Sequence, residues 1–266
     1  MGASRSLLMC PPDYYGIEYE INPWMDVRRP ADAERAGGQW QALYDLLRSL
    51  GVHVELVEPV KGLPDLVFTA NAGIVADRRF IASRFLHPER QREQPTWEAW
   101  FRARGYRIET LPEKACFEGE GDALWFGTTM FAGYRIRSDI RSHQALATIV
   151  GHEVLSLELV DERFYHLDTC FCPLDERRAL YYPPAFDDYG RRVIAQFVPD
   201  PVAVDDADAA RFGCNAIVVG RDVILQSGCA ALERSLRGLG FSPHAVDLSE
   251  FHKAGGSAKC LALWIG

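Results

Sequence analysis

The sequence predicts a five-bladed, pseudo-symmetric α/β propeller, built as a single domain over residues 1–266. Two observations carry this prediction. A pattern of helix, strand, polar loop and paired strands occurs five times, and one marker residue in each loop recurs at intervals of 51, 46, 47 and 45 residues; these markers are Asn71, Asp122, Asp168, Asn215 and Cys260. Self-similarity at about 50 residues is typical of propellers and other repeat architectures.

The helix of each repeat is indicated by apolar residues at three- and four-residue steps. Asp187 and Ser138 are suitable N-caps, and Gly240 follows the last helix. The expected helices cover Pro30 to Leu50, Arg90 to Arg104, Ser138 to Val150, Asp187 to Phe197, and Ala230 to Leu239.

Short apolar segments predict the strands. The first strand of each repeat is expected at His53 to Glu58, Tyr106 to Leu111, Glu153 to Leu157, Val202 to Val204, and Pro243 to Val246. The loops FTANAG, FEGEGD, FYHLDT, FGCNA and GGSAKC follow. After each of the first four loops, two strands are joined by a turn, at Asp77-Arg78, Gly127-Thr128, Asp175-Glu176 and Gly220-Arg221.

The fifth repeat has no return strand after CLALWI, and Leu7 to Cys10 can supply it. Pairing of the N- and C-terminal strands would close the ring and remove the open sheet edge. Equivalent loops of such a ring point to one axis, so all five loops are expected to meet in a central pocket. An open, doubly wound sheet is the alternative, but neither G-x-G-x-x-G nor G-x-x-x-x-G-K-[ST] is present to support nucleotide binding.

Composition narrows the classes of function. The net charge is −8 and no dense basic cluster occurs, which argues against nucleic-acid partners. No run of eighteen apolar residues and no secretory signal is found, so a membrane span is not expected and the chain is predicted to be cytoplasmic. Seven cysteines without an export signal argue against a disulfide framework. The Cys170-x-Cys172 pair has no second pair at zinc-ligand spacing, so neither a metal nor another cofactor is expected.

The fifth loop offers a nucleophile. Cys260 follows two glycines and Lys259, and this lysine or nearby amides can favour a thiolate. His166 and Asp168 alternate along an extended segment of the third loop and can face one pocket. A cysteine and a histidine on equivalent loops are typical of thiol-based covalent catalysis, although each alone is more often a structural core residue.

The second loop, FEGEGD, places three carboxylates between glycines. A surface acidic turn is the simpler interpretation. If the carboxylates converge on the pocket, however, a planar, permanently charged guanidinium is the ligand that suits them best. Glu118 and Asp122 would hold it. His252 is a rival base that lies outside the repeat pattern, and it is discounted.

Together FTANAG, FEGEGDALW, FYHLDTCF and GGSAKCL resemble the amidinotransferase and arginine deiminase superfamily, whose five-unit fold is called the pentein. The segments MCPP and YEINPWM resemble the cyanobacterial-type arginine dihydrolases in particular. That subgroup converts arginine to ornithine, carbon dioxide and two ammonia. The resemblance covers essentially the whole chain.

The resemblance implies roles for individual residues. Cys260 attacks the guanidinium carbon, His166 protonates the leaving group and activates water, and Glu118 orients His166 or the substrate. Asn71 joins these catalytic residues. The expected substrate contacts are Asn22, Asp122, Asp168, Arg90, and Arg135 or Arg137, the arginines as partners of the α-carboxylate.

Asn71 decides the expected reaction. Arginine deiminases and dimethylargininases resemble this chain but carry an aspartate at this position, whose charge pairs with guanidinium and not with a neutral ureido group. An amide both donates and accepts, so it can retain citrulline for a second attack by Cys260. The expected product is therefore ornithine.

Other functions on the same fold stay open. A dimethylargininase, an arginine deiminase or an amidinotransferase has the cysteine and histidine pair, whereas ribosome-binding penteins lack it. A homo-oligomer is compatible with the sequence. Two features differ from the arginine dihydrolases: Glu120 stands where smaller residues are usual, and those enzymes often carry a second, cyclodeaminase-like domain, whereas this sequence ends five residues beyond Leu261.

Overall fold

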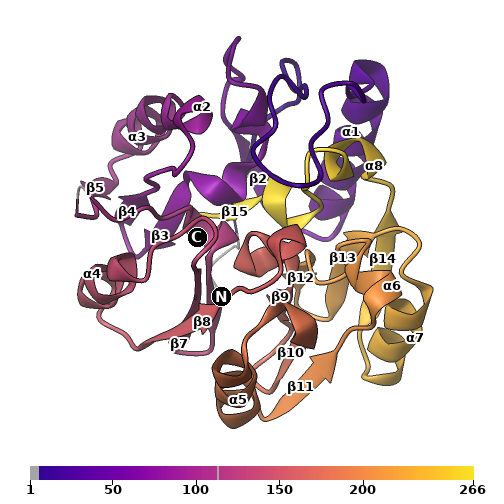
Figure 1. Cartoon of the computed structure of the whole chain (residues 1–266). Coiled ribbons are helices and arrows are strands. Elements are labelled where there is room, and N and C mark those ends of the chain that lie inside the picture. The colour runs from indigo at the N-terminus through magenta and orange to yellow at the C-terminus, as the bar shows by residue number, and fades with distance from the viewer. Residues whose placement is uncertain (1–5, 113) are drawn as a thin grey trace. The chain divides into compact units, whose positions relative to one another are not determined.

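The computed structural model describes residues 6–112 and 114–266. The chain divides into two compact units. The terminal unit contains the residues up to 70 together with residues 206–266, and the middle unit contains residues 71–205. Figure 1 labels the elements of both. The prediction of one domain over the whole chain stays a prediction.

The described residues form five three-stranded sheets. The terminal unit has two of them, β15-β1-β2 and β12-β13-β14. Their strands are β1 (Ser6–Met9), β2 (His53–Leu56), β12 (Ile217–Val219), β13 (Asp222–Gln226), β14 (Ser242–Val246) and β15 (Leu263–Trp264).

The middle unit has the other three sheets, β3-β4-β5, β6-β7-β8 and β11-β10-β9. Their strands are β3 (Gly73–Ala76), β4 (Arg79–Ala82), β5 (Arg107–Glu109), β6 (Ala123–Phe126), β7 (Thr129–Tyr134), β8 (Val154–Glu158), β9 (Phe171–Pro173), β10 (Arg178–Tyr181) and β11 (Asp200–Ala203).

Every sheet has the same internal order. Its middle strand pairs antiparallel with one neighbour and parallel with the strand that follows the next long helix; for example, β4 pairs antiparallel with β3 and parallel with β5. The first strand of each predicted repeat therefore pairs with the hairpin of the repeat before it. The predicted hairpin turns are present, and Asp77 adopts a left-handed φ of 55° in the first of them.

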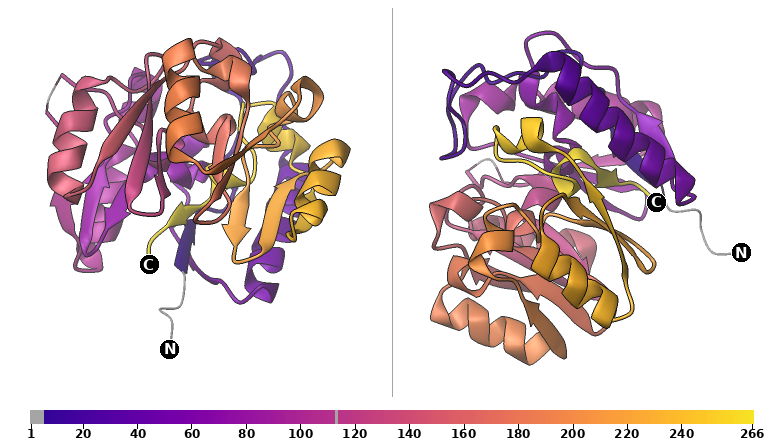
Figure 2. Two further views of the ribbon diagram at one scale, coloured as in Figure 1. Left: turned by 90° about the horizontal axis from the view of Figure 1, so that it is seen from below. Right: turned by 90° about the vertical axis from the view of Figure 1, so that its right-hand side faces the viewer.

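The two ends of the described chain meet in the terminal unit. Strand β1 pairs antiparallel with β15, with Leu7 opposite Trp264, and this pairing was predicted from the sequence. In the left view of Figure 2 the indigo strand β1 lies beside the yellow strand β15. Helix α1 (Ala33–Ser49) then leads to β2, which pairs parallel with β1.

The helices differ from the prediction at two places. The single helix expected at 90–104 is two helices, α2 (Pro88–Gln91) and α3 (Gln94–Ala103), because Pro95 cannot donate a helical hydrogen bond and starts a new helix. Helix α4 (Arg141–Val150) begins after Ile140, so Ser138 is not its N-cap. Its hydroxyl bonds Asp122 instead.

The other helices are α5 (Asp188–Phe197), α6 (Asp206–Ala209), α7 (Ala230–Gly238) and α8 (Ser249–His252). Asp187 is the N-cap of α5, as predicted, since its side chain accepts the backbone N–H of Gly190. Strand β11 starts two residues earlier than expected and contains Pro201. A proline is tolerated there because β11 is the outer strand of its sheet.

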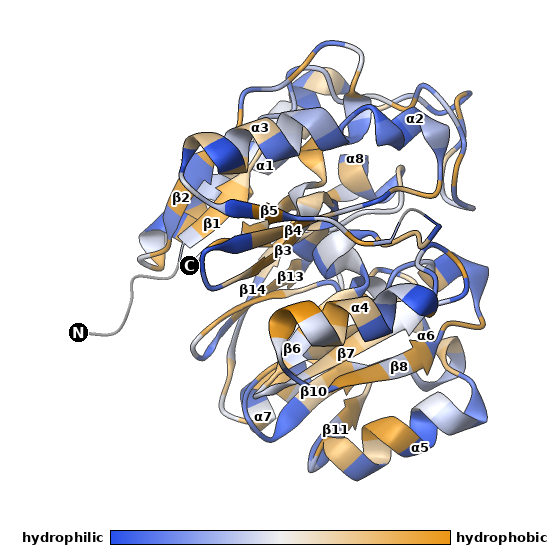
Figure 3. Cartoon of the chain, turned by 90° about the vertical axis from the view of Figure 1, so that its left-hand side faces the viewer, coloured by the Kyte–Doolittle hydropathy of each residue, from blue (hydrophilic) through white to orange (hydrophobic). Residues whose placement is uncertain are grey.

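Each unit has its own hydrophobic core. In the terminal unit Trp40 and Leu43 of α1 pack with Phe68 and Phe251, and in the middle unit Ile81, Phe117 and Met130 are buried together. In Figure 3 the strands β7 and β8 are largely hydrophobic, whereas α4 has both hydrophobic and hydrophilic residues. Within the described residues, no helix combines the length and apolarity needed to cross a membrane.

Candidate active site

A buried carboxylate in the middle unit binds an imidazole and a guanidinium. Glu118 Oε2 lies 2.7 Å from His166 Nε2 and 2.9 Å from Arg137 Nη1, and Oε1 accepts the backbone N–H of Leu86 at 3.2 Å. Glu118 and His166 immediately precede two short 3-10 helices, η3 (Gly119–Gly121) and η5 (Leu167–Thr169). These equivalent loops hold both side chains in the interior.

The charges of this group follow from its contacts. Burial raises the pKa of Glu118, but Arg137, the hydrogen bond with His166 and Arg90 outweigh it and hold that pKa below its ordinary range. Burial lowers the pKa of His166 to about 4, against the opposing effect of Glu118. An ionised carboxylate only accepts, so Nε2 of neutral His166 carries the proton. Its Nδ1 lone pair can then take up a second proton.

A second buried group fixes the amide of Asn71. Arg90 donates Nη1–H to Asn71 Oδ1 at 2.8 Å, and its other nitrogens bind both carboxylate oxygens of Glu93, at 2.7 and 3.0 Å. A guanidinium only donates, which places the amide oxygen toward Arg90 and the NH₂ group toward the Glu118 carbonyl oxygen, at 3.4 Å. Asn71 is thus oriented as a donor beside the Glu118 loop.

Gly121 permits this close approach. A Cβ at this position would clash with Nδ2 of Asn71 and lie 3.4 Å from Nδ1 of His166. The loops of the first three repeats therefore meet within the middle unit, at Asn71, Gly121 and His166. Gly121 of FEGEGD must therefore be a glycine, because it contacts the side chains of Asn71 and His166, two predicted catalytic residues.

Asp122 connects the Glu118 and His166 loops through hydrogen bonds. Its Oδ2 accepts the Ser138 hydroxyl at 2.6 Å and its Oδ1 accepts the Leu167 N–H at 3.1 Å, while Ser138 Oγ accepts the Glu118 N–H at 3.0 Å. Burial, together with Glu118 and Asp168, raises the pKa of Asp122 well above its ordinary range. Asp168 is also buried. The predicted substrate contacts of both aspartates stay predictions.

The two candidate arginines of GYRIRSD differ. The side chain of Arg137 is 3% exposed and binds Glu118. That of Arg135 is 55% exposed and pairs with Glu158 of β8 at 2.9 Å. The structure therefore brings Arg137, and not Arg135, into the group with His166.

The nucleophile candidate lies in the terminal unit. Cys260 is 3% exposed and belongs to a 3-10 helix, η7 (Lys259–Leu261). Asn215 donates Nδ2–H to its sulfur at 3.2 Å. Lys259, which was considered as a partner of the thiolate, donates Nζ–H to the Ala262 carbonyl at 3.0 Å. The meeting of Cys260 with His166 stays a prediction.

Asn22 organises a loop of the terminal unit. Its Nδ2 donates to the Ala254 carbonyl at 3.0 Å, and its Oδ1 accepts the backbone N–H groups of Trp24 and Met25 at 2.9 and 3.3 Å. This ties the segment after Tyr19 to the glycine-rich loop before Cys260. Its predicted contact with substrate stays a prediction.

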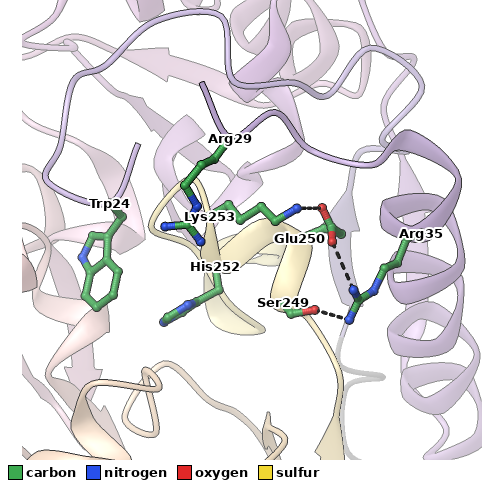
Figure 4. A pocket seen from close by; sticks show the side chains of 7 residues that line it. All are labelled: Trp24, Arg29, Arg35, Ser249, Glu250, His252 and Lys253. Carbon is green, nitrogen blue, oxygen red and sulfur yellow. Dashed lines mark hydrogen bonds and ion pairs between the residues drawn. The ribbon is translucent and has the colours of Figure 1, made fainter. Parts of the chain in front are cut away.

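His252, the histidine discounted as a base, lines a cavity of the terminal unit. The cavity has a volume of about 360 Å³, and the other residues that line it are drawn in Figure 4: Trp24, Arg29, Arg35, Ser249, Glu250 and Lys253. Glu250 binds Lys253 Nζ at 2.6 Å there. The His252 ring packs on Trp24 and Phe212, with centroids 4.8 and 4.9 Å away, and burial lowers its pKa.

Sequence reasoning missed three supporting residues. Glu93 and Ser138 make buried hydrogen bonds to Arg90 and Asp122, and Asn215 was expected at the central pocket as a repeat marker but was given no role. Position in the repeat gave a signal for Asn215 alone. Across residues 6–112 and 114–266, no three His, Cys, Asp or Glu side chains form a metal-binding group, and the cysteines form no disulfide.

A family model described as "N,N dimethylarginine dimethylhydrolase, eukaryotic" matches residues 20–265. The chain belongs to this family. It is 51% identical over 96% of its length to the bifunctional arginine dihydrolase/ornithine cyclodeaminase AgrE of Nostoc sp., and covers 37% of that protein. It is 43% identical to the N(G),N(G)-dimethylarginine dimethylaminohydrolase of Mycobacterium tuberculosis, over 98% of this chain and 86% of that protein.

Solved structures of the family confirm the fold class. The N-terminal domain of ArgZ, in a covalent complex with a reaction intermediate, matches with a TM-score of 0.95 and 45% identity over 98% of each chain. A dimethylarginine dimethylaminohydrolase adduct matches with a TM-score of 0.81 at 20% identity, which bears on the fold alone. These matches confirm the predicted superfamily, the resemblance to cyanobacterial arginine dihydrolases and the pentein fold. The relatives are named as hydrolases of guanidino compounds, which is the predicted enzyme class.

Proposed function

We propose that this chain is an arginine dihydrolase, which hydrolyses L-arginine to L-ornithine, carbon dioxide and two ammonia without a cofactor. Its supports are the 51% identity to AgrE and the amide at Asn71. The chain spans 37% of the length of the curated arginine dihydrolases it matches, AgrE and ArgZ. The activity proposed here is that of the arginine dihydrolase part.

The first half-reaction uses a thiol and an imidazole. Nδ1 of His166 takes up the thiol proton of Cys260 as the sulfur attacks the guanidinium carbon, and His166 passes this proton to one nitrogen, which leaves as ammonia. Neutral His166 then removes a proton from water, which attacks the amidino-thioether and releases citrulline and the thiolate. Glu118, held ionised by Arg137, keeps the imidazole in the tautomer that has Nδ1 as the base.

The second half-reaction repeats this chemistry on the ureido group. Cys260 attacks the ureido carbon, a second ammonia leaves, and water releases a carbamate that loses carbon dioxide to give ornithine. Asn71 supports this pass because its NH₂ group can donate to the ureido oxygen, whereas an aspartate has no proton to donate. Arg90 and Glu93 hold the amide in the required orientation.

The proposal extends to the substrate contacts, the cellular compartment and the oligomeric state. Asp122 and Asp168 lie beside the guanidinium, Asn22 lines the substrate site, and Arg90, with Arg135 or Arg137, binds the α-carboxylate. The partner is a small guanidine compound in the cytoplasm, and self-association into a homo-oligomer is compatible with the sequence.

Product analysis tests the proposal. Purified protein is incubated with arginine carrying ¹³C in its guanidino carbon, and mass spectrometry follows citrulline, ornithine and labelled carbon dioxide. The expected result is ornithine with labelled carbon dioxide and two ammonia per arginine, and none of these with Cys260→Ser. Stoichiometric citrulline without ornithine would contradict it.

A dimethylargininase is the second candidate, favoured by the family model and by the Mycobacterium tuberculosis relative. It would release dimethylamine and citrulline from asymmetric dimethylarginine. Comparing kcat/KM for arginine and dimethylarginine on the same preparation decides between the two functions.

A further inference from the structure

Asn215 contacts the proposed nucleophile at two points. Its Nδ2 lies 3.2 Å from the sulfur of Cys260, and its Oδ1 accepts the backbone N–H of Cys260, also at 3.2 Å. Its own carbonyl oxygen accepts the N–H of Lys259 at 3.4 Å. The side chain of Asn215 therefore spans the backbone and the reacting atom of one residue.

The direction of these hydrogen bonds is fixed by chemistry. A backbone N–H can only donate, so it must face the amide oxygen of Asn215. The planar amide then turns its NH₂ group toward the sulfur, which is the acceptor. A thiolate accepts a hydrogen bond more strongly than a neutral thiol, because a charged acceptor strengthens the bond.

The loop before Asn215 holds its side chain in place. Asn215 is fully buried, and its N–H donates to the Phe212 carbonyl at 2.9 Å. Phe212 has a left-handed φ of 56°, which is unfavourable for a bulky residue, and its buried ring packs on Trp24. Packing thus maintains a strained turn whose result is a fixed amide beside Cys260.

We infer that Asn215 stabilises the Cys260 thiolate and aims the sulfur for attack on the guanidinium carbon. This inference rests on the proposed function, since it needs Cys260 to be the nucleophile. It assigns the fourth repeat a part in the reaction: Asn215 donates to the sulfur, a role separate from the proton transfer proposed for His166.

The test is Asn215→Asp in the full chain. The carboxylate keeps an oxygen for the Cys260 N–H, but replaces the donor to sulfur by a second oxygen and adds a negative charge. The alkylation rate of Cys260 with iodoacetamide is measured against pH, by mass spectrometry of the peptide that contains it. We expect the midpoint, which is the pH at which alkylation of Cys260 reaches half its maximal rate, to rise by about one pH unit or more. We expect kcat/KM at neutral pH to fall about tenfold or more.

Two further variants separate this role from a structural one. Asn215→Ala removes both hydrogen bonds and should also raise the midpoint. Gln226→Glu is the matched control, because the Gln226 side chain accepts the Leu248 N–H at 2.9 Å in the same unit. It makes the same amide-to-acid change at another buried position, and the Cys260 midpoint should stay unchanged. Circular dichroism checks that each variant is folded.

The outcomes distinguish the inference from the proposed function. If Cys260→Ser keeps full turnover, Cys260 is not the nucleophile and the proposed function fails. If Cys260→Ser is inactive, but folded Asn215→Asp and Asn215→Ala keep the wild-type midpoint, only the role of Asn215 is overturned.

Discussion

The imidazole of His166 lies 2.7 Å from the carboxylate of Glu118, and both side chains are buried. Arg137 binds the same carboxylate oxygen at 2.9 Å. This contact determines which nitrogen of His166 is free, and so where a proton can be taken up.

Replacing Glu118 by Gln should lower kcat at least about a hundredfold, because His166 loses the charge that orients it and stabilises its protonated form. Arg137 also loses its buried partner, so the free energy of unfolding should fall by about 3–5 kcal/mol. Steady-state assays and urea denaturation measure the two effects. The control is Glu98→Gln, which removes the charge that pairs with Arg102 and keeps an oxygen that can accept from Gln94, and which should change stability by less than about 1 kcal/mol. Wild-type kcat in Glu118→Gln would contradict the assigned role.

Asn71→Asp should turn a dihydrolase into an enzyme that stops at citrulline. One carboxylate oxygen can still accept from Arg90, but no hydrogen remains to donate to the ureido oxygen. Time courses with arginine should show citrulline accumulating and ornithine nearly absent. Undiminished ornithine production by this variant would show that the amide does not control the second half-reaction.

Gly121→Ala tests the close approach of the loops. The added methyl group would displace Asn71, so we expect a loss of about 1–3 kcal/mol of stability and at least about tenfold in kcat/KM. Gly37→Ala is the matched control, since a Cβ there meets nothing within 4 Å in helix α1. It should be neutral or stabilise the fold by about 0.5–1 kcal/mol. Thermal unfolding and activity assays check both; equal behaviour of the two variants would be evidence against the contact.

His143 should make the fold sensitive to acid. Its Nε2 lies 3.3 Å from the Gly133 carbonyl and its Nδ1 lies 2.7 Å from the Ser156 hydroxyl, and burial lowers its pKa from 6.5 to about 4. Between these values the unfolded chain binds more protons than the folded one, so this stability is present above pH 6.5 and is lost as the pH falls toward 4.

The check is urea denaturation at several pH values with His143→Asn. This variant should lose less stability than the wild type between pH 6.5 and pH 4. An unchanged pH dependence would mean that the pKa of His143 is ordinary.

The sequence was sufficient for the repeat, because hydrophobic periodicity and turn residues are local signals. Helix α5 and its Asp187 cap, the hairpin turns and the pairing of β1 with β15 were predicted in this way. The break between α2 and α3 and the start of α4 were not. Ser138 has the chemistry of an N-cap, but its hydroxyl donates to Asp122, which lies at the end of η3 just before β6.

The site was predictable where chemistry is concentrated in a repeated loop, as for His166 and Glu118. Supporting residues were harder to find. Glu93 contributes through Arg90, and nothing in its local sequence shows that contact. The choice between Arg135 and Arg137 depends on which of the two side chains is buried against Glu118, which is a property of the folded chain.

In the proposed mechanism Cys260 attacks the guanidinium carbon, while His166 accepts and donates the protons. Acid quenching of the protein during turnover of arginine, followed by peptide mass spectrometry, tests it most directly. We predict that the Cys260 peptide carries an adduct with the mass of arginine less one ammonia. In Cys260→Ser we predict neither this adduct nor any turnover. An adduct on another residue, or full turnover by Cys260→Ser, would contradict the mechanism.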